Sequence, residues 1–396
     1  VQKTPVPEEE IWADPALGVW PAWPVGPDEG AVAAALDVIL SAKRPVAICG
    51  GGVVIAGAEA ELDRLARRLD LIVATTISGQ GSLAETHPNG LGVVGSNGGV
   101  PATRAVVDEA DLVIFIGCRA GSVTTERWRS PAPGTRIVHI DSDPQAIAAN
   151  YETEAPVLGD ARLALRALNR ALDARGTAPQ FDGASRVARA KRDKAAAFDP
   201  LANSVERPIR PERLVAALRR VLDDDAILVA DPGTPCPYLS AFYEIRSTGR
   251  TLFSNRAHGA LGYSLSAALG AAYGRPGVKV VSVMGDGSFG FTCGELETVV
   301  RSRQPITFIV VSNNVYGWIK AGQKSGFGGR YYSVDFGETD HAAVAAAFGV
   351  KSWRVEDPED LQRVLQEAVD HDGPSLVDVI CQPLHEAKAP VSEWVA

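Results

Sequence analysis

The 396-residue chain is longer than one hydrophobic core ordinarily supports, so we expect two α/β domains of ordinary size. Its composition, 46% hydrophobic and 22% charged, is that of a folded globular protein and excludes wholesale disorder. A net charge of −9 with scattered Lys and Arg residues provides no basic surface for a nucleic-acid backbone.

The first segment, residues 1–27, is rich in proline, which disfavours both helix and strand. We predict an extended N-terminal arm here, with Trp12, Trp20 and Trp23 packed on a neighbour. The three glutamates at positions 8–10 are interpreted as solvated charges.

Residues 28–172 alternate amphipathic helical patterns with short, continuously apolar segments. This alternation is typical of a parallel sheet that helices cover on both faces. We therefore predict a doubly wound α/β domain. Its expected strands are residues 45–50, 71–76, 112–117 and 136–141.

Residues 173–207 interrupt the alternation with a polar stretch, a charged helix and prolines near the far end, and we interpret them as a linker. A second doubly wound parallel-sheet domain is predicted at 208–384, followed by a C-terminal tail at 385–396. The expected strands of this second domain are residues 226–231, 251–255, 278–285, 306–313, 350–355 and 375–381.

Polar residues follow two neighbouring strands of this second domain. The sequence GDG lies at 285–287, and two asparagines lie at 313–314. A crossover helix of ordinary length makes these strands neighbours, and ligands of parallel sheets bind beyond the carboxyl ends of strands. Asp286 and Asn314, 28 positions apart, are therefore predicted to face one crevice. Their oxygens, with a backbone carbonyl, are ligands that suit Mg²⁺.

The turn around Asp286 is also suited to a phosphate group. Gly285 and Gly287 let phosphate oxygens approach the backbone. Ser288, which we interpret as the start of the next helix, provides N-terminal amides that favour anions. The crevice is therefore predicted to bind a magnesium-bound diphosphate.

GDG followed after 25 residues by NN resembles the signature of thiamine diphosphate (ThDP) enzymes. In that family the aspartate, the last asparagine and the carbonyl two residues later bind the metal. The resemblance thus implies Asp286, Asn314 and the main chain of Tyr316 as metal ligands.

The resemblance extends over nearly the whole chain. The sequences AKRPVAICGGGVVIAGA, ATTISGQGSLAETHP and EADLVIFIGCRAG look like the central domain of the acetolactate synthase and benzoylformate decarboxylase group. The sequence HGALGYSLSAALGAAYG looks like its cofactor loop. This implies a Rossmann-like central domain at 28–172 and a ThDP diphosphate-binding domain at 208–384.

The resemblance also assigns cofactor contacts. Leu261 would lie under the bent cofactor, and the Gly259 carbonyl would accept a hydrogen bond from the aminopyrimidine. The sequence DPGTP at 231–235 resembles the first diphosphate-contacting turn. The implied cofactor-binding residues are Gly233, Thr234, Gly259, Leu261, Gly285, Gly287, Ser288, Asn314, Tyr316 and Gly317.

Four residues are candidates for contact with the substrate. His258 precedes the cofactor loop, and Tyr316, Trp318 and Lys320 follow the metal asparagine on an expected short helix, from which one or more would line the substrate pocket. Packing roles for His258 and Trp318 are the alternative and stay open. Acetolactate synthases carry a tryptophan that shapes acceptor choice where this chain has Gly322, so the resemblance favours a differently shaped acceptor.

Members of this family normally begin with a pyrimidine-binding domain that carries a catalytic glutamate, and this chain resembles only the two domains that follow. We therefore expect a partner: a small pyrimidine-domain subunit, in a heterotetramer, with truncation as the alternative. The implied function is a split, ThDP- and Mg²⁺-dependent lyase or carboligase, such as a decarboxylase, acting on a 2-oxo acid or 2-hydroxyketone. The alternatives are a 2-hydroxyacyl-CoA lyase or oxalyl-CoA decarboxylase-like enzyme, and a non-catalytic ThDP-binding or regulatory subunit.

The first domain offers a weaker hypothesis of nucleotide binding. The glycines at 50–52 lack the full dinucleotide spacing. Asp141 and Asp143 lie where some relatives hold FAD or the ADP part of coenzyme A. The residues after Arg119 lack the charged cluster of FAD-binding relatives, so a flavin is disfavoured and a CoA thioester stays open.

Five cysteines, odd in number and far apart, indicate neither a disulfide framework nor a zinc site. Cys236 and Cys293 lie near the diphosphate turns but are interpreted as inert packing residues. No apolar run reaches the length of a membrane span, and the acidic start does not resemble a signal peptide. We therefore expect a cytoplasmic protein without a membrane partner.

Overall fold

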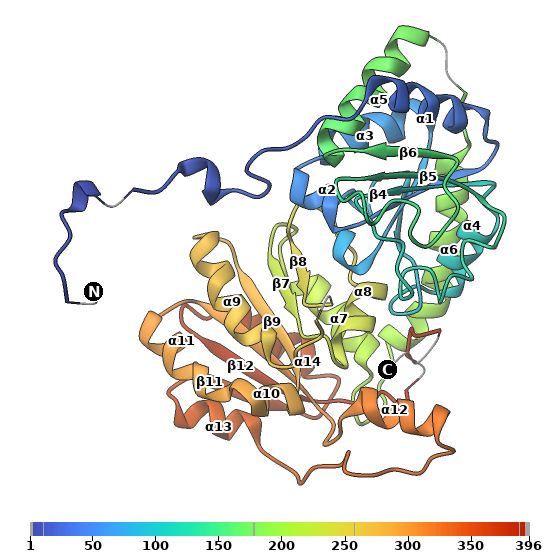
Figure 1. The fold of residues 1–396 in the computed structure, drawn as a ribbon. Coiled ribbons are helices and arrows are strands. Elements are labelled where there is room, and N and C mark those ends of the chain that lie inside the picture. The colour runs from blue at the N-terminus through green and yellow to red at the C-terminus, as the bar shows by residue number, and fades with distance from the viewer. Residues whose placement is uncertain (1–2, 11, 177–178, 257, 388, 393–396) are drawn as a thin grey trace.

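The computed structural model describes residues 3–10, 12–176, 179–256, 258–387 and 389–392. They form two six-stranded parallel sheets with helices on both faces, which confirms the predicted pair of doubly wound α/β units (Figure 1). The strand orders are β3-β2-β1-β4-β5-β6 and β11-β12-β10-β9-β7-β8.

The first sheet contains β1 (Pro45–Cys49), β2 (Ile72–Thr75), β3 (Gly90–Val93), β4 (Leu112–Ile116), β5 (Arg136–Asp141) and β6 (Ala155–Leu158). Side chains alternate between its faces, as the strand geometry requires. Ala47 and Cys49 of β1 pack with α1 (Glu29–Ser41), α3 (Glu59–Leu69) and α5 (Ala161–Arg175). Val46 and Ile48 face the other way, toward α4 (Pro101–Asp108) and α6 (Gly183–Ala202). A short helix, α2 (Gly51–Ala56), follows β1.

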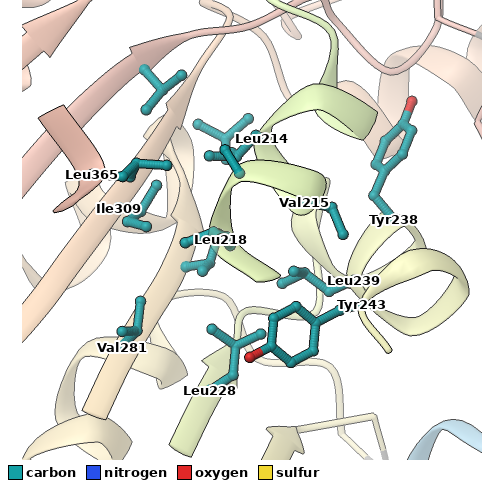
Figure 2. Close-up of a cluster of buried hydrophobic side chains, with 14 of the residues drawn as sticks. Leu214, Val215, Leu218, Leu228, Tyr238, Leu239, Tyr243, Val281, Ile309 and Leu365 are labelled. Carbon is teal, nitrogen blue, oxygen red and sulfur yellow. The ribbon is translucent and has the colours of Figure 1, made fainter. Parts of the chain in front are cut away.

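The second sheet contains β7 (Ile227–Ala230), β8 (Leu252–Ser254), β9 (Val280–Gly285), β10 (Ile306–Ser312), β11 (Lys351–Val355) and β12 (Ser375–Ile380). One face packs against α7 (Pro211–Val221), α8 (Pro235–Phe242), α12 (Gly317–Gly326) and α14 (Leu361–Val369). Figure 2 shows this core, in which Leu214 and Leu218 of α7 lie near Ile309 and Val281 of the central strands. The other face packs against α9 (Tyr263–Gly274), α10 (Asp286–Thr292), α11 (Leu296–Ser302) and α13 (His341–Ala347).

The structure adds detail where the sequence pattern was weak. Strands β3 and β6 were not among the expected strands, because glycine in the first and proline in the second obscure an apolar pattern. Within the segment 173–207, α6 buries Val187 and Ala190 against the first sheet, so this part of the expected linker is packed structure. The domain boundaries themselves stay predictions.

The crossover between β9 and β10 also differs from the expected single helix. It consists of α10, a 3₁₀ turn (Cys293–Glu295) and α11. α10 begins at Asp286, two residues earlier than expected, with Gly285 at the N-cap. The two strands are nevertheless hydrogen-bonded neighbours, as predicted.

The N-terminal arm runs away from the two sheets (Figure 1). Its described residues form two 3₁₀ turns, Glu8–Glu10 and Pro15–Gly18. Trp12, Trp20 and Trp23 are 80%, 78% and 70% exposed. Packing of these side chains on a neighbour stays a prediction. In the part of the chain that the structure describes, every helix is too short or too polar to cross a lipid bilayer.

Candidate functional site

The candidate site lies beyond the carboxyl ends of β9 and β10. Asp286 follows β9 directly, and its carboxylate reaches across to the chain that leaves β10. One carboxylate oxygen accepts hydrogen bonds from the amides of Asn313 at 2.8 Å and Asn314 at 2.6 Å. The other oxygen accepts the Gly287 amide at 2.8 Å. The structure therefore brings the two motifs together through Asp286.

Asp286 is a buried carboxylate that forms no ion pair with a Lys or Arg of the described residues. It is 5% exposed, and burial raises its pKa, although the three amide bonds and the nearby His341 counteract this shift. A buried negative charge in this setting is stabilised when a cation binds beside it.

The donors near Asp286 suit a hard cation. The backbone of Asn314 has a φ of +56°, and its exposed side chain lies beside a cavity of about 400 Å³ that Asp286 and Tyr316 also line. No three His, Cys, Asp or Glu side chains gather at a metal-binding distance anywhere in the described ranges. A metal at Asp286 would therefore rely on amide and backbone oxygens, which Mg²⁺ accepts together with water.

A neighbouring loop holds the chain after β10 in place. The Asn314 carbonyl accepts the amide of Phe336, and the Tyr316 amide donates to the Val334 carbonyl, each at 2.8 Å. The Tyr316 and Phe336 rings meet edge to face with centroids 4.4 Å apart. A Cβ atom on Gly287 would lie 2.6 Å from the Tyr316 ring, so this position requires glycine.

Most of the predicted site residues line one cavity of about 520 Å³, which we call the main cavity. These residues are Gly233, Thr234, His258, Gly259, Leu261, Gly285, Asp286, Gly287, Ser288, Tyr316, Gly317 and Trp318. Asn314 lines the adjoining 400 Å³ cavity, on the other side of Asp286. Ser122 and Val123 of the first unit also line the main cavity, so it lies between the two sheets.

The turn after β7 and the start of α12 approach each other closely at the main cavity. A Cβ atom on Gly317 would lie 3.0 Å from the Thr234 hydroxyl and 3.2 Å from the Leu384 Cβ. Leu261 lies next to Gly233. Gly317 therefore allows α12 to approach the turn at Thr234 closely.

Asp231 is a site residue that the sequence analysis missed. It is fully buried at the end of β7 and accepts hydrogen bonds from the Gly262 amide at 3.2 Å, the Ser264 amide at 3.1 Å and the Ser288 hydroxyl at 3.0 Å. Burial raises its pKa, and these donors oppose that shift. Asp231 therefore joins three loops of the site. The signals in the sequence were an aspartate directly after an apolar strand and its place at the start of the DPGTP turn.

Ser288 and Lys320, both named in the sequence analysis, form side-chain contacts that the sequence did not indicate. The Ser288 hydroxyl donates to Asp231, which leaves its backbone amide, in the first turn of α10, as the donor for an anion. Lys320 lies on α12, but its ammonium group contacts Asp335 at 2.5 Å and does not line the main cavity. His258 is exposed, and Trp318 lines the main cavity from α12.

A second cavity of about 430 Å³ lies at the carboxyl ends of the first sheet. The glycines at 50–52 and Arg119 line it, and it shares Ser122, Val123 and Arg256 with the main cavity. Neither Asp141 nor Asp143 lines this cavity. Instead, Asp141 accepts the amide of Asp143, and Asp143 accepts the amide of Gln145, so both side chains stabilise a local turn.

Comparisons with known proteins agree with this geometry. Residues 32–168 match the thiamine pyrophosphate enzyme central domain, and residues 231–379 match the thiamine pyrophosphate enzyme C-terminal TPP binding domain. The chain is 32% identical over 361 residues to a probable acetolactate synthase large subunit of Methanococcus aeolicus, which covers 88% of this chain and 60% of that protein. It is 33% identical to the corresponding probable large subunit of Methanocaldococcus jannaschii, with 88% and 59% covered. The acetolactate synthase large subunit of Parasynechococcus marenigrum is 33% identical, with 90% and 57% covered. The chain thus spans about 60% of the length of the curated relatives that it matches.

Proposed function

Because the chain belongs to the family of thiamine pyrophosphate (ThDP) enzymes, we propose that it is the large subunit of a Mg²⁺- and ThDP-dependent C–C bond lyase or carboligase. Its substrate would be a 2-oxo acid or a 2-hydroxyketone. The observation that carries the proposal is the buried Asp286 carboxylate, which pairs with no Lys or Arg of the described residues, at the junction of the two motif loops.

Asp286, Asn314 and the Tyr316 carbonyl would hold Mg²⁺, and the metal would hold the diphosphate. The donor chemistry supports this assignment, because all three groups are hard oxygen ligands. The Tyr316 carbonyl already accepts the Lys320 amide at 2.9 Å, and its second lone pair remains for a metal. The Ser288 amide, the backbone at Gly287 and the turn at Gly233 and Thr234 would surround the diphosphate.

Leu261 and Gly259 would support the organic part of the cofactor. Leu261 is 36% exposed and lines the main cavity. Gly259 lines it too, and its φ of +74° is a left-handed backbone conformation that glycine adopts readily. When bound, ThDP supplies a carbon centre that stabilises the carbanion left by C–C bond cleavage. The protein groups orient the substrate beside it and exclude water, with Trp318 and His258 as wall residues of the main cavity.

We further propose that a companion polypeptide completes the active site. Of the described residues that line the main cavity, Asp286 is the only acidic one, and none is a glutamate. The glutamate that activates the cofactor would therefore come from a small pyrimidine-domain subunit, in a heterotetramer. Several relatives are named large subunits, which supports the presence of a second kind of subunit.

The metal site is tested by calorimetric titration of the assembled protein with ThDP and Mg²⁺. We expect Asp286→Ala and Asn314→Ala each to weaken ThDP binding by about 10-fold or more, because each removes a metal ligand. The control is Asp372→Asn, an exposed aspartate that precedes β12 and therefore lies at the amino ends of the parallel strands, away from their carboxyl ends. Unchanged ThDP affinity in both site variants would contradict the proposal.

The requirement for a companion is tested separately. The purified chain alone should bind ThDP weakly and turn over no 2-oxo acid, whereas the chain purified with its companion should cleave the substrate. Full turnover by the chain alone would refute the split assembly while leaving the metal site intact.

A 2-hydroxyacyl-CoA lyase is the second candidate. It is favoured by the second cavity, which opens beside the main cavity through Ser122, Val123 and Arg256 and is large enough for part of a nucleotide. In this case acyl-CoA thioesters, rather than free 2-oxo acids, should bind and be cleaved.

A further inference from the structure

Arg256 lies in the loop after β8, where the main cavity meets the second cavity. It lines both cavities, as do Ser122 and Val123 of the first unit. Its guanidinium donates one hydrogen bond to the Pro232 carbonyl at 3.0 Å and lies 5.8 Å from the centre of the Trp318 ring. The carbonyl and the ring hold the charged group in one place at the cavity wall.

The positive charge of Arg256 has no acidic partner in the described ranges. No Asp or Glu side chain there forms an ion pair or hydrogen bond with it. A guanidinium has five N–H donors, and the Pro232 carbonyl accepts from only one nitrogen. The side chain is half-buried, so the remaining donors face a site where an anion would be bound more strongly than in open water.

Arg256 reaches from the start of the turn at Gly233 and Thr234 toward the first unit. Asp286, Ser288 and Thr234 line the main cavity but not the second cavity, whereas Arg256 lines both. The arginine therefore lies at the end of the main cavity that faces the first unit. An anion held there would be a part of the substrate rather than the cofactor's diphosphate.

The carboxylate that leaves in a decarboxylation is a poor partner for this arginine. An ion pair with that group would stabilise the bound substrate more than the transition state, in which the negative charge moves away from the carboxylate, and would therefore slow the reaction. An anionic group that stays unchanged during the reaction gains binding energy from Arg256 without this cost.

We propose that Arg256 is a specificity-determining residue that binds a second anionic group, remote from the reacting carbonyl, on the substrate. The substrate class is then a 2-oxo acid or 2-hydroxyketone whose far end carries a carboxylate, sulfonate or similar compact anion. This inference rests on the proposed lyase or carboligase function and adds the chemistry of the substrate's far end.

The test compares straight-chain 2-oxo acids of equal length that end in a carboxylate, a sulfonate or a methyl group. With the assembled protein, kcat/KM should favour the charged substrates by about 10-fold or more. Arg256→Gln should remove this preference, mainly by raising KM by about 10- to 100-fold, and should change kcat/KM for the methyl-terminated substrate less than about threefold. Arg256→Lys, which keeps the charge but loses the planar fork, should retain part of the preference. Comparison of kcat/KM for the carboxylate-terminated and sulfonate-terminated substrates identifies which anion fits better.

A binding measurement keeps the test independent of turnover. The saturated dicarboxylate of the same length, which has no reactive carbonyl, should bind the ThDP-loaded protein in calorimetry and should lose that binding in Arg256→Gln. The affinity for ThDP should be unchanged. The control is Arg250→Gln, an exposed arginine in the same segment, which should leave the preference for charged substrates intact.

The outcomes separate this inference from the proposed function. If ThDP binds and methyl-terminated 2-oxo acids are cleaved while charged substrates gain no advantage, only the role of Arg256 is refuted. Equal losses for all substrates, a weakened ThDP affinity in Arg256→Gln, or turnover confined to acyl-CoA thioesters would also overturn it. Absence of ThDP binding by the wild-type assembly would instead refute the proposed function, and a dicarboxylate titration of the ThDP-free assembly and its Arg256→Gln variant would then decide whether Arg256 binds the anion.

Discussion

Three buried carboxylates of the second unit differ in how their charges are compensated. Asp231 accepts two amides and one hydroxyl, and Asp286 accepts three amides. Glu212, in the first turn of α7, is 0% exposed, and neither of its carboxylate oxygens has a hydrogen-bond partner among the described residues. The first two each have three hydrogen-bond donors, whereas the burial of the Glu212 carboxylate has an electrostatic cost that the nearby charge of Arg210 offsets only in part.

This cost predicts a pH-dependent effect of Glu212→Gln. Burial raises the pKa of Glu212 above the usual 4.5, so its contribution to stability is complete below that pH and is lost as the pH rises through the folded-state pKa. Gln carries no charge at any pH. We therefore expect equal stabilities near pH 4 and a variant more stable by on the order of 1 kcal/mol at pH 8.

Urea unfolding at several pH values measures this difference. Glu297→Gln on α11 is the control, because Glu297 is 61% exposed in its side chain and pairs with Arg301 at the surface. Its effect should stay within about 0.5 kcal/mol and vary little with pH. A Glu212→Gln effect that did not change with pH would show that burial does not perturb this group.

At the scale of elements, the site depends on how closely α12 approaches the turn after β7. The start of α12 at Gly317 contacts Thr234 and Leu384, whereas Gly322 in the middle of the same helix faces open space. The tight contact brings the chain after β10 beside the turn after β7, so both line the main cavity. The position of α12 therefore shapes the site as much as the motif residues do.

This difference predicts opposite effects of the same substitution at two positions of one helix. Gly317→Ala should lower the free energy of unfolding by about 1–2 kcal/mol and weaken ThDP binding, because its Cβ would lie 3.0 Å from the Thr234 hydroxyl. Gly322→Ala should raise the free energy of unfolding by up to about 1 kcal/mol, because alanine favours a helix interior. Chemical denaturation and ThDP titration measure both quantities. Equal effects at the two positions would show that α12 shifts to accommodate the added methyl group at position 317.

At the scale of the whole molecule, buried polar contacts connect the two sheets. The Glu85 amide donates to the Ile245 carbonyl at 2.6 Å, and Lys194 of α6 lies 3.6 Å from the Glu85 carboxylate. Burial raises the pKa of Glu85, and Lys194 and Lys191 oppose that shift. Residues of the first sheet's loops, of α6 and of the second unit thus meet at one point, which helps hold the main cavity between the units.

The N-terminal arm predicts an effect on assembly without an effect on stability. Replacement of Trp12, Trp20 and Trp23 by serine should change the free energy of unfolding by less than about 0.5 kcal/mol, because all three are exposed. If the arm packs on a neighbour, the triple variant should shift the assembly toward smaller species in analytical ultracentrifugation. Trp128→Ser, at a 45% exposed tryptophan of the first unit, is the control. An unchanged assembly would show that the arm does not contribute to association.

The fold and the juxtaposition of Asp286 with the paired asparagines could be predicted from sequence because their signals are local. Apolar strands such as residues 112–117 and 306–313 are continuous, and their alternation with helices specifies two parallel sheets. Asp286 and the paired asparagines could be placed at one crevice because neighbouring parallel strands end at the same edge. β3 and β6 were missed because glycine and proline interrupt their short apolar patterns.

The amino-acid sequence was sufficient to predict the two-sheet architecture and the juxtaposition of Asp286 with residues 313–314. The hydrophobic periodicity encodes the first, and the spacing of the motifs encodes the second. Three-dimensional packing was needed to identify the contacts that complete the site. Asp231 meets Gly262, Ser264 and Ser288 across 31, 33 and 57 residues, and Arg256 lies between two cavities built from different units. No periodic pattern encodes such distant pairs, because they depend on how loops fold back over the sheet edges once both cores have formed.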